Sequence, residues 1–194
     1  MRSAAGARRV AGASWFAAAL LLGLSLSAAA ELAPAFIVRS ASTVLVDKVY
    51  HLNAQIDYHF STDALDALDN GVPLVVELVI EIEHHRDYLW NETVASLHQR
   101  YQLSYEALTR RYVVTNLNSG ADTYYSDRGA AITALGEVNS LPILDAGLLA
   151  PGEDYDVRLQ ASLDLEALPV PMRVIGYFSS RWSISSGWFS WPLQ

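Results

Sequence analysis

Five neighbouring residues have side chains that could bind a metal ion. Glu81, Glu83, His84, His85 and Asp87 offer the imidazole and carboxylate groups that zinc and copper accept, and a closed zinc site needs about four of them in tetrahedral array. On a strand, however, His84 and His85 point to opposite faces. Side chains on one face are about 7 Å apart at each step, which is too far for one ion. We interpret the segment as a solvent-exposed strand edge followed by a polar turn, and we expect no metal site.

Nucleophilic catalysis finds equally little support in the residue pattern. The serines gather between residues 179 and 186 without the flanking glycines of a nucleophile elbow, and no phosphate-binding glycine loop is present in the sequence. The absence of cysteine excludes a thiol nucleophile and a thiolate-bound zinc. We therefore expect no catalytic residue and no cofactor, and we do not expect an enzyme.

Aromatic side chains near the C-terminus are the strongest candidates for a binding surface. Six of them lie between residues 177 and 191, and the four that we select are Trp182, Trp188, Phe189 and Trp191. Tryptophan is enriched at the energetic centres of protein interfaces and also stacks on sugars. The alternative is that Trp182 and one neighbour fill the end of the fold. The closeness of Trp188 and Trp191, in a segment interrupted by Gly and Pro, argues against burial of all four.

Three segments alternate between apolar and polar residues with a period of two. They are residues 50–60, 74–83 and 155–166, and each has one apolar and one polar face. Because side chains on a strand point alternately to the two faces of the sheet, these segments predict antiparallel sheets that cover a core on one side.

Weaker patterns fill the rest of the chain. We expect further strands at residues 36–47, 93–105, 110–117, 123–126, 172–184 and 188–191, and short helices at residues 64–69 and 130–138. Prolines at positions 142 and 151 predict a loop after the second helix. The predicted fold class is all-β and mainly antiparallel, a two-sheet β-sandwich of about eight strands with one or two short helices.

The first thirty residues have the order of a secretory signal peptide. Arg2, Arg8 and Arg9 precede an apolar run over residues 15–26, and three alanines follow at 28–30. We expect residues 1–30 to be a signal peptide and residues 31–194 a single β-sandwich domain, exported to the periplasm by the general secretory route. The apolar run is shorter than a membrane span of about 20 residues. An uncleaved leader would nevertheless leave the chain tethered to the membrane.

Net charge limits the kinds of partner that the chain can bind, and cysteine content limits how its fold is stabilised. The chain has 13 Lys and Arg against 21 Asp and Glu; without the three leader arginines the remainder carries 10 against 21, a net charge of −11. A domain with this net negative charge repels nucleic acid and anionic membrane surfaces. An exported domain without cysteine is stabilised by its core and not by disulfides.

Several hydrophobic and aromatic blocks are distinctive: Trp90 and residues 101–105, 112–114, 168–173, 182–188 and 191–193. Together they resemble an uncharacterised exported proteobacterial family, domain-of-unknown-function family 4390. The resemblance implies no activity and no catalytic residues. Genes of the family often neighbour an rRNA methyltransferase and a membrane sensor kinase with its response regulator, which implies an accessory role near a sensor.

The sequence thus predicts an exported, acidic periplasmic accessory or interaction protein of the bacterial envelope. The expected partner is an envelope protein, with a membrane sensor kinase as the candidate, and nucleic acid is not expected as a partner. One alternative is a binding module for a glycan or another small molecule. A weaker alternative is an envelope hydrolase.

Overall fold

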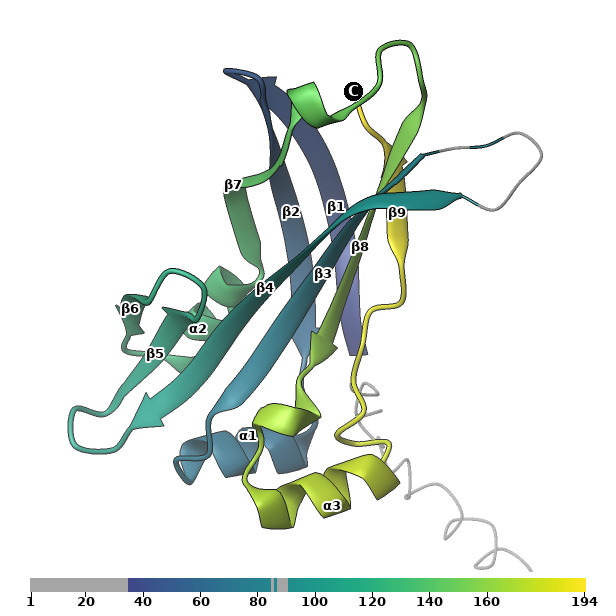
Figure 1. The fold of residues 1–194 in the computed structure, drawn as a ribbon. Coiled ribbons are helices and arrows are strands. Elements are labelled where there is room, and N and C mark those ends of the chain that lie inside the picture. The colour runs from purple at the N-terminus through teal and green to yellow at the C-terminus, as the bar shows by residue number, and fades with distance from the viewer. Residues whose placement is uncertain (1–34, 85, 87–90) are drawn as a thin grey trace, which may run out of the picture. The chain divides into compact units, whose positions relative to one another are not determined.

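The structure, a computed structural model, describes residues 35–84, 86 and 91–194, and its strands form two antiparallel sheets (Figure 1). The smaller sheet has the strand order β1-β2-β7, with β1 at Ala35–Val46, β2 at Val49–His59 and β7 at Glu137–Asp145. The larger has the order β6-β5-β4-β3-β8-β9, with β3 at Leu74–His84, β4 at Glu92–Glu106, β5 at Arg111–Asn116, β6 at Ala121–Tyr125, β8 at Tyr155–Leu163 and β9 at Phe189–Pro192. The predicted all-β sandwich is confirmed, with nine strands in the described residues where about eight were expected.

The core lies between the two sheets and is built from the alternating residues. Its fully or nearly buried side chains include Leu52, Ile56 and Tyr58 of β2, Leu74, Val76, Leu78, Ile80 and Ile82 of β3, and Val157, Leu159, Ala161 and Leu163 of β8. The register confirms the pattern, because Leu78 stands opposite Ala161 and Ile80 opposite Leu159 on the same face. Alternation in the sequence therefore identifies the dry face of the three central strands.

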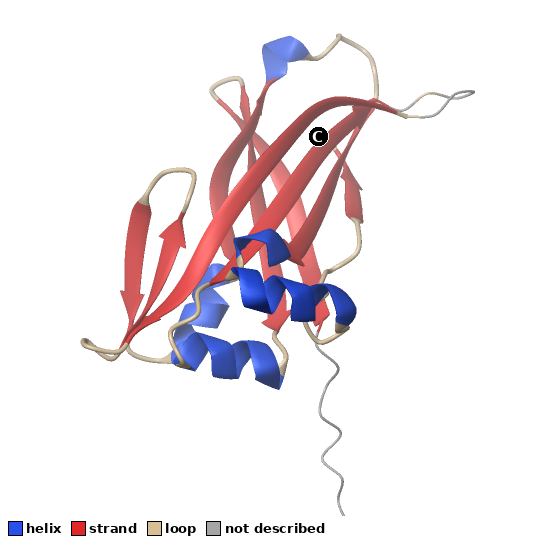
Figure 2. Cartoon of the chain, turned by 60° about the horizontal axis from the view of Figure 1, so that its bottom comes forward, coloured by secondary structure: helices blue, strands red, loops and turns tan. Residues whose placement is uncertain are grey.

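Short helices gather at one end of the sheets (Figure 2). Helix α1 (Thr62–Asp69) begins at Ser61, whose hydroxyl accepts a hydrogen bond from the Ala64 amide at 3.2 Å, and α2 (Arg128–Leu135) begins at Asp127 in the same way. Helix α3 (Val170–Phe178) lies at the same end. Of the two 3₁₀ turns, η2 (Leu165–Ala167) precedes α3, whereas η1 (Ala146–Leu148) lies at the opposite end. No helix in the described ranges has the length and apolar character needed to span a membrane.

The strand predicted at residues 172–184 is wrong. The first part of this segment belongs to α3, because prolines 169 and 171 fix the backbone for a first helical turn. Val, Tyr and Phe favour strands in general, which explains the error. Helix α3 is also a third helix beyond the one or two expected.

Strand β7 was missed, because the prediction placed a loop around Pro142. β7 lies at the edge of the three-stranded sheet, where a residue without an amide donor is tolerated. Its pairing with β2 shifts register twice, around His51 and between Leu52 and Ala54. Such interruptions hide the alternation that identifies the other strands.

A buried hydroxyl in the core leads to a testable expectation. The Tyr58 side chain is 6% exposed, and its hydroxyl has no hydrogen-bond partner among the described residues. Because an unpaired buried polar group opposes folding, Tyr58→Phe is expected to leave the free energy of unfolding unchanged or raise it by about 1 kcal/mol at pH 7. Urea denaturation of both proteins measures this difference.

The same residue predicts a pH dependence. Burial, and to a smaller extent the neighbouring Tyr101, raises the pKa of Tyr58, so the folded state keeps the phenol neutral. The unfolded state ionises near pH 10. The contribution of Tyr58 to the free energy of unfolding is therefore fully present below pH 10, and it falls as the pH rises above 10. The fall should be shallower in Tyr58→Phe, and parallel curves for the two proteins would contradict the assignment.

Candidate docking surface

The outer face of the larger sheet carries a charged cluster at its β9 edge. Strand pairing places Arg158 of β8 between Glu81 of β3 and Ser190 of β9. These residues alternate with the buried positions of their strands, so their side chains share the outer face. β9 is the last strand of the sheet in its described part, and this cluster therefore lies beside a sheet edge.

Arg158 is held in place by two carboxylates. Its guanidinium donates to Glu83, and it lies 4.0 Å from Glu81. Glu83 is only 8% exposed, and its second oxygen accepts a hydrogen bond of 3.3 Å from the Asn91 side chain. A carboxylate so nearly buried needs a cationic partner, and this fixes the orientation of the Arg158 side chain.

Trp188 covers this guanidinium from the solvent side. The Arg158 guanidinium carbon lies 4.3 Å from the centroid of the indole, which is the geometry of a cation–π contact. Gly187, immediately before it, has a positive φ of 66° that lets the chain turn into β9. Trp188 remains 41% exposed. We call Trp188, Arg158, Glu81 and Glu83 the Trp188 surface; it presents an indole that is oriented before any partner arrives.

The structure does not bring the four selected aromatic residues onto one surface. Trp182 is 4% exposed and belongs to the core, the alternative that the sequence left open for it. Phe189 and Trp191 stand opposite the buried Leu159 and Val157, so they point to the inner side of β9, with ring centroids 6.0 Å apart. Of the four, only Trp188 lies on the outer face.

The residues considered for metal binding are engaged elsewhere. Glu81 and Glu83 face Arg158, and His84 contacts Glu153 at 2.9 Å and packs against Tyr155. His85 and Asp87 lie outside the described residues. Within the described ranges, no group of three or more His, Asp or Glu side chains has the geometry of a metal site.

One polar arrangement was missed by sequence reasoning. Ser96 and His98 share the outer face of β4, with the Ser96 hydroxyl 3.5 Å from Nε2 of His98, and Nδ1 of the same ring lies 3.1 Å from Glu77 on β3. The order resembles a Ser–His–acid triad. The alternation of residues 93–105 places Ser96 and His98 together, but only the β3–β4 register brings Glu77 to them.

The chemistry of this arrangement is limited by its position. All three side chains lie on an open sheet face, and His98 is 56% exposed. Acyl transfer needs preorganised donors for the oxyanion, and the amides of a central strand already serve the sheet ladder. At 3.5 Å the Ser96–His98 contact is at the outer limit of a hydrogen bond, and the strand amides around it are not free to stabilise a tetrahedral intermediate.

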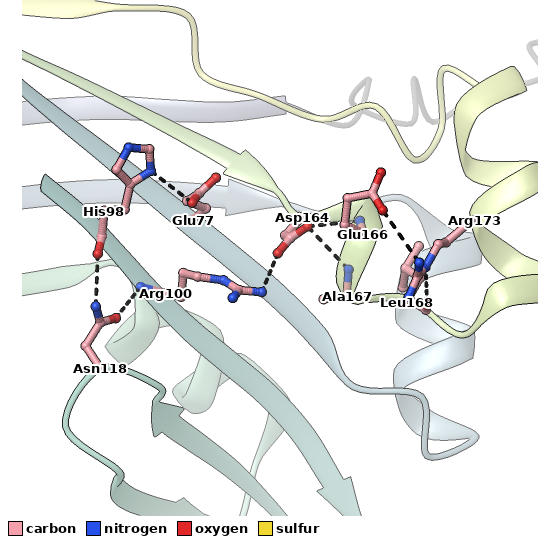
Figure 3. A network of polar contacts seen from close by, with 9 residues as sticks. All are labelled: Glu77, His98, Arg100, Asn118, Asp164, Glu166, Ala167, Leu168 and Arg173. Carbon is pink, nitrogen blue, oxygen red and sulfur yellow. Dashed lines mark hydrogen bonds and ion pairs between the residues drawn. The ribbon is translucent and has the colours of Figure 1, made fainter. Parts of the chain in front are cut away.

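His98 instead belongs to a chain of polar contacts that runs from β4 towards α3 (Figure 3). The Asn118 side chain donates to the His98 carbonyl and accepts from the Arg100 amide, and the Arg100 guanidinium donates to Asp164 at 2.6 Å. Asp164 caps η2 by accepting from the amides of residues 166 and 167. Glu166 then meets Arg173, which lies 3.5 Å away on α3 and donates to the Leu168 carbonyl at 2.8 Å. The network fixes the position of α3 relative to the sheet.

A separate hollow lies at the end of the sandwich away from the three α-helices. Its volume is about 620 Å³, and its lining includes Tyr50, Leu149, Tyr155 and Leu193 together with the acids Glu153, Asp154 and Asp156. The Tyr155 hydroxyl accepts a hydrogen bond of 3.1 Å from the Ala150 amide. The volume is in the range of small-molecule sites.

Comparison with known proteins gives one match. A family model described as a domain of unknown function (DUF4390) matches residues 33–192, which confirms the resemblance found in the aromatic blocks. No curated protein and no solved structure shows significant similarity to the chain.

Proposed function

The chain belongs to the DUF4390 family, and we propose that it is an exported accessory protein of the bacterial envelope that binds an envelope protein through the Trp188 surface. The candidate partner is a membrane sensor kinase, and no catalytic step is part of the proposal. The observation that carries it is the exposed Trp188 indole, held over Arg158 beside the β9 edge while its aromatic neighbours point inward.

The composition of the surface favours a protein partner. Trp and Arg are the residue types most enriched among interface positions that dominate binding energy, and their mutual contact lowers the entropy lost on binding. Glu81 and Glu83 already neutralise Arg158, so a partner need not supply a buried countercharge. The leader-like residues 1–30 support a location outside the cytoplasm.

Trp188→Ala is expected to weaken partner binding by about 30-fold, the loss of a typical interface hot spot. The measurement is the dissociation constant, by calorimetry, between the protein and the purified extracytoplasmic domain of a membrane sensor kinase from the same organism. Tyr124→Ala is the matched control, because Tyr124 is a 51% exposed aromatic residue on β6, at the other edge of the same sheet.

Binding that is equally strong in the native protein and in Trp188→Ala would show that another surface is used. Complete absence of binding by the native protein would remove the kinase as the partner. A loss shared equally by Tyr124→Ala would indicate a general effect on the sheet instead of a local contact.

A second candidate function is the binding of a glycan or another small molecule in the 620 Å³ hollow. Tyr50 and Tyr155 supply aromatic surface there, and the three acids supply acceptors for hydroxyl groups. A rise in melting temperature with added sugars, absent in Tyr155→Ala, would favour this function. The weaker hydrolase alternative would require turnover that Ser96→Ala abolishes.

A further inference from the structure

Helix α3 exposes an apolar stripe to solvent. Val170, Val174, Tyr177 and Phe178 are 68%, 59%, 58% and 90% exposed. Their spacing of four, three and one residues places them on one face of the helix. Single exposed apolar residues are ordinary on protein surfaces, but four on one face of a nine-residue helix form a contiguous patch.

The other side of α3 is fixed to the body, so the stripe cannot turn inward. Gly176 is buried, and a side chain added there would lie 3.4 Å from Leu165 and 3.7 Å from Trp182. Arg173 anchors the first turns by its hydrogen bond to the Leu168 carbonyl. The stripe is therefore presented outward by a helix that is held in place.

The charged groups around the stripe are paired. Arg173 lies 3.5 Å from Glu166, whose other oxygen accepts from the Tyr177 hydroxyl, and Arg181 lies 3.2 Å from Asp63 of α1. The stripe itself contains no acid. Arg173 and Arg181 flank the stripe. Their guanidinium groups can reach the headgroup layer of a bilayer while the methylene parts of their side chains lie closer to the acyl chains.

The described chain begins at the same end of the fold. Ala35, the first residue of β1, pairs with His59 at the end of β2, and α1 follows, with its Asp63 bound to Arg181 just beyond α3 (Figures 1 and 2). In the sequence, eight residues separate Leu26, the end of the apolar run, from Ala35. Eight residues span at most roughly 28 Å.

We propose that, when the N-terminal leader is not cleaved, α3 lies on the surface of the membrane to which the leader tethers the chain, with the stripe against the lipid acyl chains. The N-terminal segment is then the tether, and α3 is the second contact that orients the sandwich. A single weak anchor plus an amphipathic surface is a common way to hold a protein at a bilayer.

A lipid surface fits the stripe better than a protein does. The stripe consists of apolar and aromatic side chains with no acid or base of its own, which is the composition of a helix face that enters the acyl–headgroup boundary. Tyr177 and Phe178 are residue types that suit the boundary between acyl chains and headgroups. Arg173 and Arg181 are already paired with Glu166 and Asp63, so the contact should not require anionic lipid.

The experiment uses the full chain in phosphatidylcholine nanodiscs. Because the sequence has no cysteine, a single label can be placed by Val174→Cys, with Leu148→Cys as the control, since Leu148 is 74% exposed in η1 at the opposite end. Quenching of an environment-sensitive fluorophore by spin-labelled phosphatidylcholine is expected to be about fivefold stronger at position 174. Anionic phosphatidylglycerol should not increase it.

A second variant tests the stripe itself. With the label at Val170→Cys, the additional changes Val174→Asp and Phe178→Asp should return quenching to the level of the Leu148→Cys control. Equal quenching at positions 174 and 148 would overturn the proposal. Protection of the 174 label from an aqueous quencher without lipid quenching would also overturn it, because the stripe would then be covered by protein. These outcomes do not involve Trp188, so they are independent of the docking proposal.

Discussion

Gly136→Ala is expected to destabilise the fold by about 3 kcal/mol or more. Gly136 ends α2, and a Cβ atom there would lie 2.0 Å from the Ile56 carbonyl oxygen of β2. Its own backbone is ordinary, with φ near −81°, so the requirement is for close approach and not for unusual conformation. Relief of the clash would break the hydrogen bond of 2.9 Å from the Ile56 amide to the Gly136 carbonyl and would pull β7 away from β2.

Chemical denaturation measures the loss, and Gly129→Ala in the same helix is its control. A Cβ at Gly129 would lie 3.0 Å from Oδ2 of Asp127, an exposed carboxylate oxygen that caps α2 and can shift at the cost of part of that cap. Because Ala also favours helix, Gly129→Ala should change stability by less than about 1 kcal/mol. Comparable stability of the two variants would show that the α2–β7 junction is more adaptable than its geometry indicates.

Trp182→Ala is expected to lower the free energy of unfolding by about 3–5 kcal/mol. The residue is 4% exposed, and it lies beside Gly176 of α3 and next but one to the buried Ile184. Loss of a buried indole removes apolar contact and leaves a cavity that neighbours fill only in part.

Trp188→Ala is the contrasting variant. It removes an exposed cation–π contact, for which about 0.5–1 kcal/mol is typical, and leaves no core cavity. Urea denaturation should therefore separate the two tryptophans clearly. Similar losses in the free energy of unfolding of both variants would show that Trp188 contributes as much as a core residue. That result would contradict its assignment as a surface residue.

Strand positions with regular alternation were predictable from the sequence. In β2, β3 and β8 the apolar residues at every second position are the buried ones, and the observed bounds differ from the predicted ones by at most three residues. Here the local pattern and the tertiary environment agree, because each of these strands has one face on the core. Two-sheet architecture followed from the same pattern.

The two elements that the prediction missed, β7 and α3, are concealed by their residue patterns. β7 contains Pro142 and two register shifts, and it is recognised as a strand only through its pairing with β2. Helix α3 consists of residues that favour strands elsewhere, and its prolines initiate a helical turn that the wider composition conceals. In both segments the outcome depends on neighbours that are distant in the sequence.

The candidate site shows the same division. Aromatic residues near the C-terminus were identifiable as a group, but the strand register of β9 decides that Phe189 and Trp191 point inward and that Trp188 covers Arg158. Likewise, Ser96 and His98 were visible as alternating residues, while Glu77 joins them only across the β3–β4 pairing.

The sequence by itself determined which face of the regularly alternating strands avoids water. Its net charge and its lack of cysteine added that the domain is acidic and is stabilised by an apolar core without disulfides. Only the tertiary structure decided which aromatic and apolar residues are left outside that core. The physical reason is that burial depends on the partner surface available at each position. Trp182 finds one in the apolar core, whereas Trp188 and the α3 stripe do not.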